Sequence, residues 1–243
     1  MKNVIYIFLV LLLIGIMLIS SNLLYKDIKE NKKQEAVFEE LIEIIKTSNS
    51  DAEESEEDYS EIFNKNEDMV AWIRIDGTNI NYPVMQTKDK PNYYLYKNFN
   101  KEYSAYGTPY IFENCDIDIS DNIIVYSHNM NNKGMFGELD NYKSKYYYDN
   151  HKNINFITKD EHRNYEIIAV FRTTVYNKNC FKYYQFINSE DEREFDTFIS
   201  KCKELSFYDT GVSAEYGDKL LTLSTCEYSS KNSRLVIVAK KLN

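Results

Sequence analysis

The chain has 243 residues, of which 43% are hydrophobic, and its formal net charge is −9 with a pI near 5.0. This length allows one substantial core with an appendage. The acidic balance argues against a nucleic-acid-binding protein, because phosphate recognition needs lysines and arginines clustered on one face. The 22 tyrosines carry little functional weight at this point, since codon bias alone can produce them.

The amino-terminal run VIYIFLVLLLIGIMLIS, residues 4–20, is uncharged and apolar. Roughly 20 such residues cross a bilayer, so the pattern predicts a membrane anchor over residues 1–21. The alternative is a cleaved signal peptide, whose apolar core is about 7 to 15 residues long and ends in a small-residue site. The chain instead continues into Leu23 and Leu24 without an Ala-x-Ala-like site, which favours an uncleaved anchor.

The lysines around this span give a conflicting signal for its orientation. Lys2 alone precedes the apolar run, whereas four lysines follow it: Lys26, Lys29, Lys32 and Lys33. By the positive-inside rule, this asymmetry favours a cytoplasmic carboxyl end.

A helical stalk and an acidic linker are predicted over residues 22–57. Apolar residues between Ile28 and Ile45 recur at helical spacing with charges between them. The block TSNSDAEESEEDYSE that follows is typical of a solvated linker, and a calcium or partner site is the alternative. It marks the boundary to a domain predicted over residues 58–243.

From Met69 onward, short runs rich in Val, Ile, Tyr and Thr alternate with turn signals, a pattern typical of β-strands. Asp76 and Gly77 form a hairpin signal between the first two runs. Many short strands with few long helices indicate a mainly β fold, either a barrel or a sandwich. The eight predicted strands are residues 70–76, 80–85, 108–113, 122–127, 153–158, 165–173, 219–225 and 235–240.

One insertion in this domain is predicted to be a long helix. Ser189 and Glu192 form a Ser-x-x-Glu capping box ahead of an apolar stripe that runs to Leu205. The segments around Phe63 and residues 142–148 predict further short helices.

The four cysteines are Cys115, Cys180, Cys202 and Cys226. An even count permits disulfides in an exported protein. Their spacing contains no CxxC and no nearby histidine, so no metal site is predicted. Cys202 falls on the apolar face of the predicted helix and is expected to be a small core residue.

The three histidines differ in their context. His151 precedes a predicted strand and His162 lies between two predicted strands, so both are expected in solvated loops. His128 ends the apolar strand NIIVYSH and is followed by a loop of Asn and Gly, a position that favours functional groups. By itself, the pattern around His128 fits a structural role better than a catalytic one.

Cys226 changes this interpretation, because it follows LLTLST where alternation hands the chain over to a loop. A buried cysteine that closes the strand is the alternative. A cysteine nucleophile needs thiolate character, a proton shuttle and donors for the oxyanion. His128 fits the shuttle, and Arg234 at the start of the next strand fits the permanent cation. No Asp or Glu identifies itself as the group that orients His128.

These residues resemble the sortase transpeptidases of Gram-positive bacteria. TLSTC, an arginine that opens the next strand and the strand-end YSHN carry the resemblance. The class B branch is indicated by AWIRIDGTNINYPVMQ, NYYLYKNF, YGTPYIFENC and NIIVYSHNMNNKGMFGELDNY in that order. The resemblance covers about residues 60–241. One departure is Ser127, where the family usually has glycine before the histidine.

The resemblance implies a closed eight-stranded sortase-type β-barrel with an amino-terminal helical extension and one long helix before the cysteine strand. It also implies a single-pass protein of the cell membrane, with the amino terminus in the cytoplasm and the catalytic domain on the extracellular face, which overrides the lysine asymmetry. The implied catalytic residues are Cys226, His128 and Arg234. The implied substrate-binding residues are Asn92, Leu95, Phe181, Ser224 and Glu227.

The implied reaction cleaves the C-terminal sorting signal of a secreted protein after threonine and joins the acyl group to a peptidoglycan amine. No cofactor, metal or nucleic acid is expected, and no disulfide in the working enzyme, because Cys226 must stay free to react. Two alternatives remain open. One is a hydrolytic cysteine peptidase that shares the thioacyl step, and the other is a non-catalytic surface-binding barrel whose cysteine is incidental.

Overall fold

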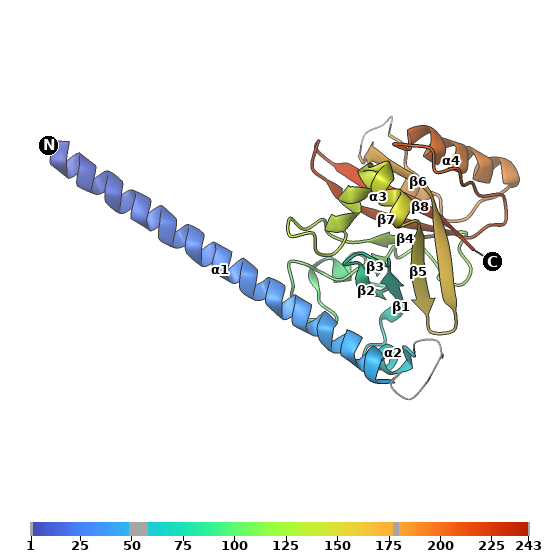
Figure 1. Ribbon diagram of the computed structural model, residues 1–243, viewed down its shortest axis with the longest axis horizontal. Coiled ribbons are helices and arrows are strands. Elements are labelled where there is room, and N and C mark those ends of the chain that lie inside the picture. Colours follow the sequence, from blue (N-terminus) through green and yellow to red (C-terminus); the bar gives the residue numbers. More distant parts are fainter. Residues whose placement is uncertain (1, 49–57, 177–179, 243) are drawn as a thin grey trace. The chain divides into compact units, whose positions relative to one another are not determined.

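A computed structural model of the chain describes residues 2–48, 58–176 and 180–242 (Figure 1). The chain divides into two compact units, Met1–Glu43 and Ile44–Asn243. Most of the predicted acidic linker lies outside the described residues, so its prediction is not tested. The domain boundary at residue 58 likewise stays a prediction.

The first unit is built from α1 (Lys2–Ser48), a single helix of 47 residues. The predicted anchor and stalk therefore form one continuous element, as expected where Gly15 is the only glycine among residues 2–48 and no proline intervenes. The apolar window of α1 has none of its residues buried, and by length and composition it can cross a membrane.

The second unit is centred on a closed barrel of eight strands in the order β1-β2-β3-β4-β7-β8-β6-β5, which confirms the predicted fold class. Most neighbours are antiparallel, but the β2–β3 and β4–β7 pairs are parallel. The strands are β1 (Met69–Arg74), β2 (Asn81–Met85), β3 (Tyr110–Ile111), β4 (Asn122–Tyr126), β5 (Asn153–Thr158), β6 (His162–Thr174), β7 (Leu220–Glu227) and β8 (Ser233–Lys241).

Two strands differ most in length from their prediction. β3 has only two residues, because Pro109 has no N–H to donate and the chain turns after it, with Cys115 N donating to Phe112 O at 3.0 Å. β6 is longer and begins at His162. The prediction of His162 in a loop is therefore wrong, although its side chain is exposed.

The long insertion forms α4 (Glu192–Leu205), which packs against the barrel beside β6 (Figure 1). Its buried residues, Phe195, Phe198, Ile199 and Cys202, join an aromatic and aliphatic cluster with residues of β6 and β8. The expected core position of Cys202 is confirmed, because this side chain has 0% exposure.

The cap of α4 differs from the predicted one by two residues. Asp191 is the N-cap and its Oδ1 accepts from Glu194 N at 2.8 Å. Ser189 is unavailable, because its N–H and hydroxyl both donate to Asp121 Oδ2, at 3.0 and 3.1 Å. A tertiary contact to the segment before β4 thus replaces the local capping box.

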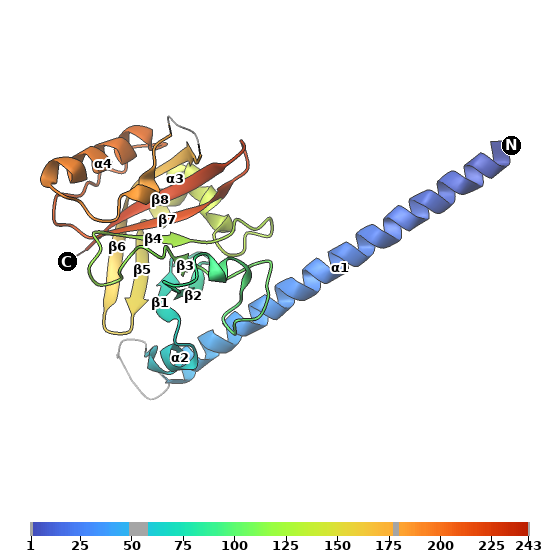
Figure 2. The same cartoon turned by 180° about the vertical axis from the view of Figure 1, so that it is seen from behind.

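The remaining helices are short. The segment around Phe63 forms α2 (Ser60–Lys65), and residues 142–148 fall in η2 (Gly137–Lys143) and α3 (Lys145–Asn150), as predicted. Two further 3-10 turns are η1 (Tyr93–Tyr96) and η3 (Tyr183–Gln185). Figure 2 shows β4, β7 and β8 side by side in the barrel wall, where the candidate site lies.

Candidate active site

Strand register brings the three predicted catalytic residues together. The parallel ladder of β4 and β7 ends with Tyr126 opposite Ser224. His128 and Cys226 each lie two residues beyond that pair, so they leave the same edge of the barrel at the same level. Arg234 is the direct register partner of Cys226 across the antiparallel β7–β8 pair. Neighbouring strands lie roughly 4.8 Å apart, so residues distant in sequence become neighbours.

All three side chains line one cavity of about 510 Å³. Cys226 and Arg234 are partly exposed, so the alternative of a sealed structural cysteine does not apply. Of the described residues that line this cavity, none is an aspartate or a glutamate. The guanidinium of Arg234 therefore faces the cavity without a carboxylate that would neutralise it there.

His128 is oriented by a backbone carbonyl in place of a carboxylate. Its Nε2 lies 2.8 Å from Leu95 O. Because a carbonyl oxygen only accepts, Nε2 carries a proton, and the neutral ring offers Nδ1 as the base. Burial lowers the pKa of His128, and the hydrogen bond to Leu95 opposes this only in part. The imidazole is therefore neutral near pH 7 and ready to accept a proton.

Arg234 lies near two buried tyrosines. Burial raises the pKa of Tyr183 to about 12, and the positive charge of Arg234 offsets part of that effect. Burial likewise raises the pKa of Tyr110. Both phenols thus stay protonated and able to donate a hydrogen bond. The guanidinium is held by its own strand, because Nη1 donates to Ser233 O at 3.0 Å.

Three of the five expected substrate-binding residues line the same cavity, namely Asn92, Leu95 and Ser224. Asn92 Oδ1 accepts from Tyr110 Oη at 2.8 Å. Ser224 Oγ lies 2.6 Å from Tyr183 Oη. Two tyrosine hydroxyls therefore set the orientation of the polar groups that face the cavity.

The other two expected residues lie elsewhere. Glu227 follows Cys226 on the same strand, so its side chain points to the opposite face, where it contacts Lys143 at 2.9 Å. Phe181 packs in an aromatic cluster, with ring centroids 5.8 Å from Phe171 and 5.7 Å from Phe198. Neither residue is among those that line the cavity with Cys226.

Sequence reasoning missed the aromatic walls of this cavity. They comprise Tyr96, Tyr110, Phe112, Tyr126, Tyr176, Tyr183 and Tyr184. Their positions in the sequence could have indicated this role, since Tyr126 lies two residues before His128 and Tyr96 follows Leu95 directly. The many tyrosines, attributed above to codon bias, thus include residues that line the candidate site.

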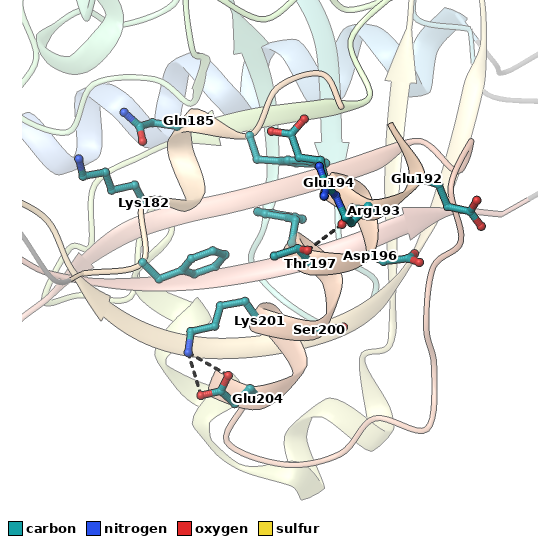
Figure 3. A pocket seen from close by; sticks show the side chains of 13 residues that line it. Lys182, Gln185, Glu192, Arg193, Glu194, Asp196, Thr197, Ser200, Lys201 and Glu204 are labelled. Atoms are coloured by element: carbon teal, nitrogen blue, oxygen red, sulfur yellow. Dashed lines mark hydrogen bonds and ion pairs between the residues drawn. The ribbon is translucent and has the colours of Figure 1, made fainter. Parts of the chain in front are cut away.

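A larger cavity of about 960 Å³ runs along α4 (Figure 3). Its aromatic lining comes from Phe181, Phe186 and Phe198, and charged side chains such as Lys201 and Glu204 surround them. Lys201 and Glu204 pair with each other at 2.8 Å. Of its described lining residues, none is a cysteine or a histidine, so the candidate cysteine and histidine both belong to the smaller cavity.

Cys115 and Cys202 are less suited to react. Burial raises the pKa of Cys115 to about 11 and also raises that of Cys202. Within residues 2–48, 58–176 and 180–242, no three His, Cys, Asp or Glu side chains converge as a metal site requires. Ser127, which departs from the family pattern, is 8% exposed, and its hydroxyl has no hydrogen-bond partner among the described residues.

Comparison with known proteins gives concordant matches. The model of the sortase domain family matches residues 73–242. Sortase B of Staphylococcus aureus (strain NCTC 8325 / PS 47) is 30% identical over 234 residues, which cover 95% of this chain and 93% of that protein. The solved Staphylococcus aureus sortase B-substrate complex is 29% identical, with a TM-score of 0.78 over 88% of this chain and 98% of that chain. A structure of sortase B complexed with triglycine is 25% identical, with a TM-score of 0.75 over 89% of this chain and 99% of that chain.

Proposed function

Since the chain belongs to the sortase family, we propose that it is a class B cysteine transpeptidase. It cleaves the sorting signal of a secreted protein after threonine and joins the new acyl group to a peptidoglycan amine. The observation that carries this proposal is the register that brings Cys226, His128 and Arg234 to one cavity.

In the first half-reaction, neutral His128 accepts the thiol proton of Cys226, and the resulting thiolate attacks the threonine carbonyl carbon of the scissile bond. The carbonyl oxygen becomes an oxyanion, which the fixed charge of Arg234 stabilises. The C–N bond then breaks, and His128 in its protonated form donates a proton to the leaving amine. A thioester between Cys226 and the client protein remains.

In the second half-reaction, the amine of a peptidoglycan precursor or cross-bridge attacks the thioester. His128 accepts the proton that this amine loses, the Cys226 thiolate leaves as the new amide forms, and His128 returns the proton to that thiolate. One imidazole thus serves as acid and then as base, as microscopic reversibility requires. The solved sortase B structures with a substrate and with triglycine support a peptide and an amine as the two partners.

The test uses the full-length protein in detergent with a library of threonine-containing peptides and triglycine as the amine. Mass spectrometry should detect an acyl adduct on Cys226 and an amide product. Cys226→Ala should abolish both, and His128→Ala and Arg234→Ala should lower the rate at least about 10³-fold. Cys180→Ala is the matched control, because Cys180 is also partly exposed, and it should keep normal activity.

The same experiment separates the alternatives. A hydrolytic peptidase would form the adduct but release only the free acid, whether or not triglycine is present. A non-catalytic binding barrel would form no adduct, and Cys226→Ala would retain its peptide binding. Either result would contradict the proposed transpeptidation.

We further propose that the apolar part of α1 spans the cell membrane once. In this arrangement the amino terminus is cytoplasmic and the barrel lies on the extracellular face, where sorting signals and peptidoglycan amines meet. The apolar, unburied window of α1 supports a membrane span. The lysines after the span oppose this orientation, so the topology needs its own test.

A further inference from the structure

The strand ends that carry His128 and Cys226 continue side by side after their ladder stops. Ser127 N donates to Ser224 O at 3.3 Å. Thr225 Oγ1 donates to Ser127 O at 2.8 Å. Beyond the backbone ladder, side-chain hydrogen bonds therefore connect the two strand ends. At this level, a small shift of either strand end changes the distance between the His128 imidazole and the Cys226 thiol.

Asn129, the residue after His128, makes the outermost of these links. Its Nδ2 donates to Cys226 O at 2.8 Å and to Asp140 Oδ2 at 3.1 Å. Both partners only accept, which fixes the orientation of the amide. The backbone carbonyl oxygen of Asn129 accepts a hydrogen bond from Tyr228 Oη at 2.8 Å. Asn129 is 6% exposed and does not line the cavity with Cys226.

The partner of this amide is itself held in place. Lys143 Nζ lies 3.0 Å from Asp140 Oδ1 and 2.9 Å from Glu227 Oε1. The contacts thus run from Asn129, next to His128, through Asp140 and Lys143 to Glu227. Glu227 is the residue after Cys226. A network of this kind, which is partly buried and includes two ion pairs of Lys143, restrains the groups that it connects.

The loop between Asn129 and η2 leaves little room for adjustment. Phe136 N donates to His128 O at 2.9 Å. A Cβ added at Gly137 would lie 2.5 Å from Met130 O and 3.3 Å from Asn129 Oδ1. The absence of a side chain at Gly137 therefore lets the segment after His128 lie directly against η2.

We propose that Asn129 is a positioning residue of the transpeptidation, and this inference rests on the proposed function. It ties the segment that bears His128 to the carbonyl of Cys226 and so fixes the imidazole relative to the thiol without touching the substrate. A displacement of about 1 Å in such an arrangement costs roughly 10²-fold in rate. The effect belongs to kcat, because substrate contacts are unchanged.

The decisive variant is Asn129→Asp, which keeps the shape but places a carboxylate against two acceptors. We expect kcat to fall about 10- to 100-fold, with KM within about threefold of the wild type. Asn114→Asp makes the same chemical change at an exposed position and should leave both constants unchanged. An unchanged kcat, or a loss confined to KM, would overturn the proposal.

A second variant separates positioning from a general loss of stability. In Asn129→Asp combined with Asp140→Asn, the amide and carboxylate exchange places, so their mutual hydrogen bond returns while Cys226 O stays opposite a carboxylate. We expect the melting temperature to rise above that of the single variant while kcat stays low. Recovery of kcat to within about threefold of the wild type would show that Asn129 acts through stability alone.

A substrate-free measurement keeps the two proposals apart. The rate at which iodoacetamide alkylates Cys226, read by peptide mapping, needs no sorting signal. We expect Asn129→Asp to slow it about threefold or more, because a displaced imidazole is less able to accept the thiol proton of Cys226. An unchanged rate would overturn the role of Asn129. Failure of the wild type to turn over any peptide would instead count against the proposed function.

Discussion

At the residue scale, Asn92 shows how one buried hydroxyl prepares a binding group. Its backbone lies in the left-handed region, with φ 57° and ψ 19°, which asparagine tolerates better than most residues. Because Tyr110 donates to its Oδ1, the Asn92 amide nitrogen stays available to donate to a peptide in the cavity. We therefore expect Tyr110 to affect peptide binding through Asn92.

We predict that Tyr110→Phe raises KM for the peptide about three- to tenfold and leaves kcat within about twofold, because one net hydrogen bond is worth about 1 kcal/mol. Steady-state kinetics with the peptide identified by the adduct screen would measure this. Tyr146→Phe is the control, since Tyr146 is 81% exposed on α3. An unchanged KM for Tyr110→Phe would argue against the Tyr110–Asn92 pair.

At the element scale, the ends of strands and helices decide which side chains are available. Ser189 loses the cap of α4 to Asp191 because Asp121 binds it. Glu227 at the end of β7 is tied to η2 through Lys143. Burial by itself would raise the pKa of Glu227, but hydrogen bonds from Ser229 and Lys143 outweigh it and lower the pKa to about 2.

This pKa predicts an acid-sensitive link between β7 and η2. A carboxyl whose folded pKa lies below its unfolded value of 4.5 contributes stability above that pH and loses it as the pH falls toward 2. We therefore expect Glu227→Gln to lower the free energy of unfolding by up to about 3 kcal/mol at pH 7. The difference from the wild type should narrow between pH 5 and pH 3.

Urea unfolding at pH 7, 5 and 3 would measure both effects. Glu215→Gln, at an exposed position, should change the free energy by less than about 0.5 kcal/mol throughout. A difference for Glu227→Gln that stays constant with pH would show that the ionised carboxylate is not the stabilising species.

At the scale of the whole molecule, the chain combines a helix suited to a bilayer with a barrel whose interior is filled by its own side chains. Trp72, Ile73 and Phe156 are 0% exposed. Closure leaves the barrel no free sheet edge. The candidate site therefore lies at an end of the barrel, where β4 and β7 end and β8 begins. The proposed topology places that surface outside the cell.

The topology predicts which end of the chain a membrane-impermeant maleimide reaches. In a background of Cys180→Ala and Cys226→Ala, Tyr146→Cys should label in intact cells. Asn3→Cys should label only after lysis. Both positions are exposed, so accessibility depends on the membrane alone. Labelling of Asn3→Cys in intact cells would favour the orientation that the lysines indicate.

Local patterns were sufficient for much of this protein. The apolar run, the alternating strands and the stripe before Leu205 predicted α1, most of the barrel strands and α4, because hydrophobic periodicity and turn residues act over short stretches. His128, Cys226 and Arg234 could be selected because each lies at a strand end, and the family resemblance joined them into one set.

Tertiary structure decided the features that depend on partners distant in sequence. Register across β4, β7 and β8 brings the three residues to one cavity, a backbone carbonyl at Leu95 orients His128, and Phe181 and Glu227 turn away from the cavity. The hydrogen bonds of Asn129 and Tyr110 join segments that no local pattern connects. Side-chain direction and pairing across a closed sheet arise only once all its strands are in place, which is why the sequence by itself predicted the candidate reacting groups but not the contacts that hold them.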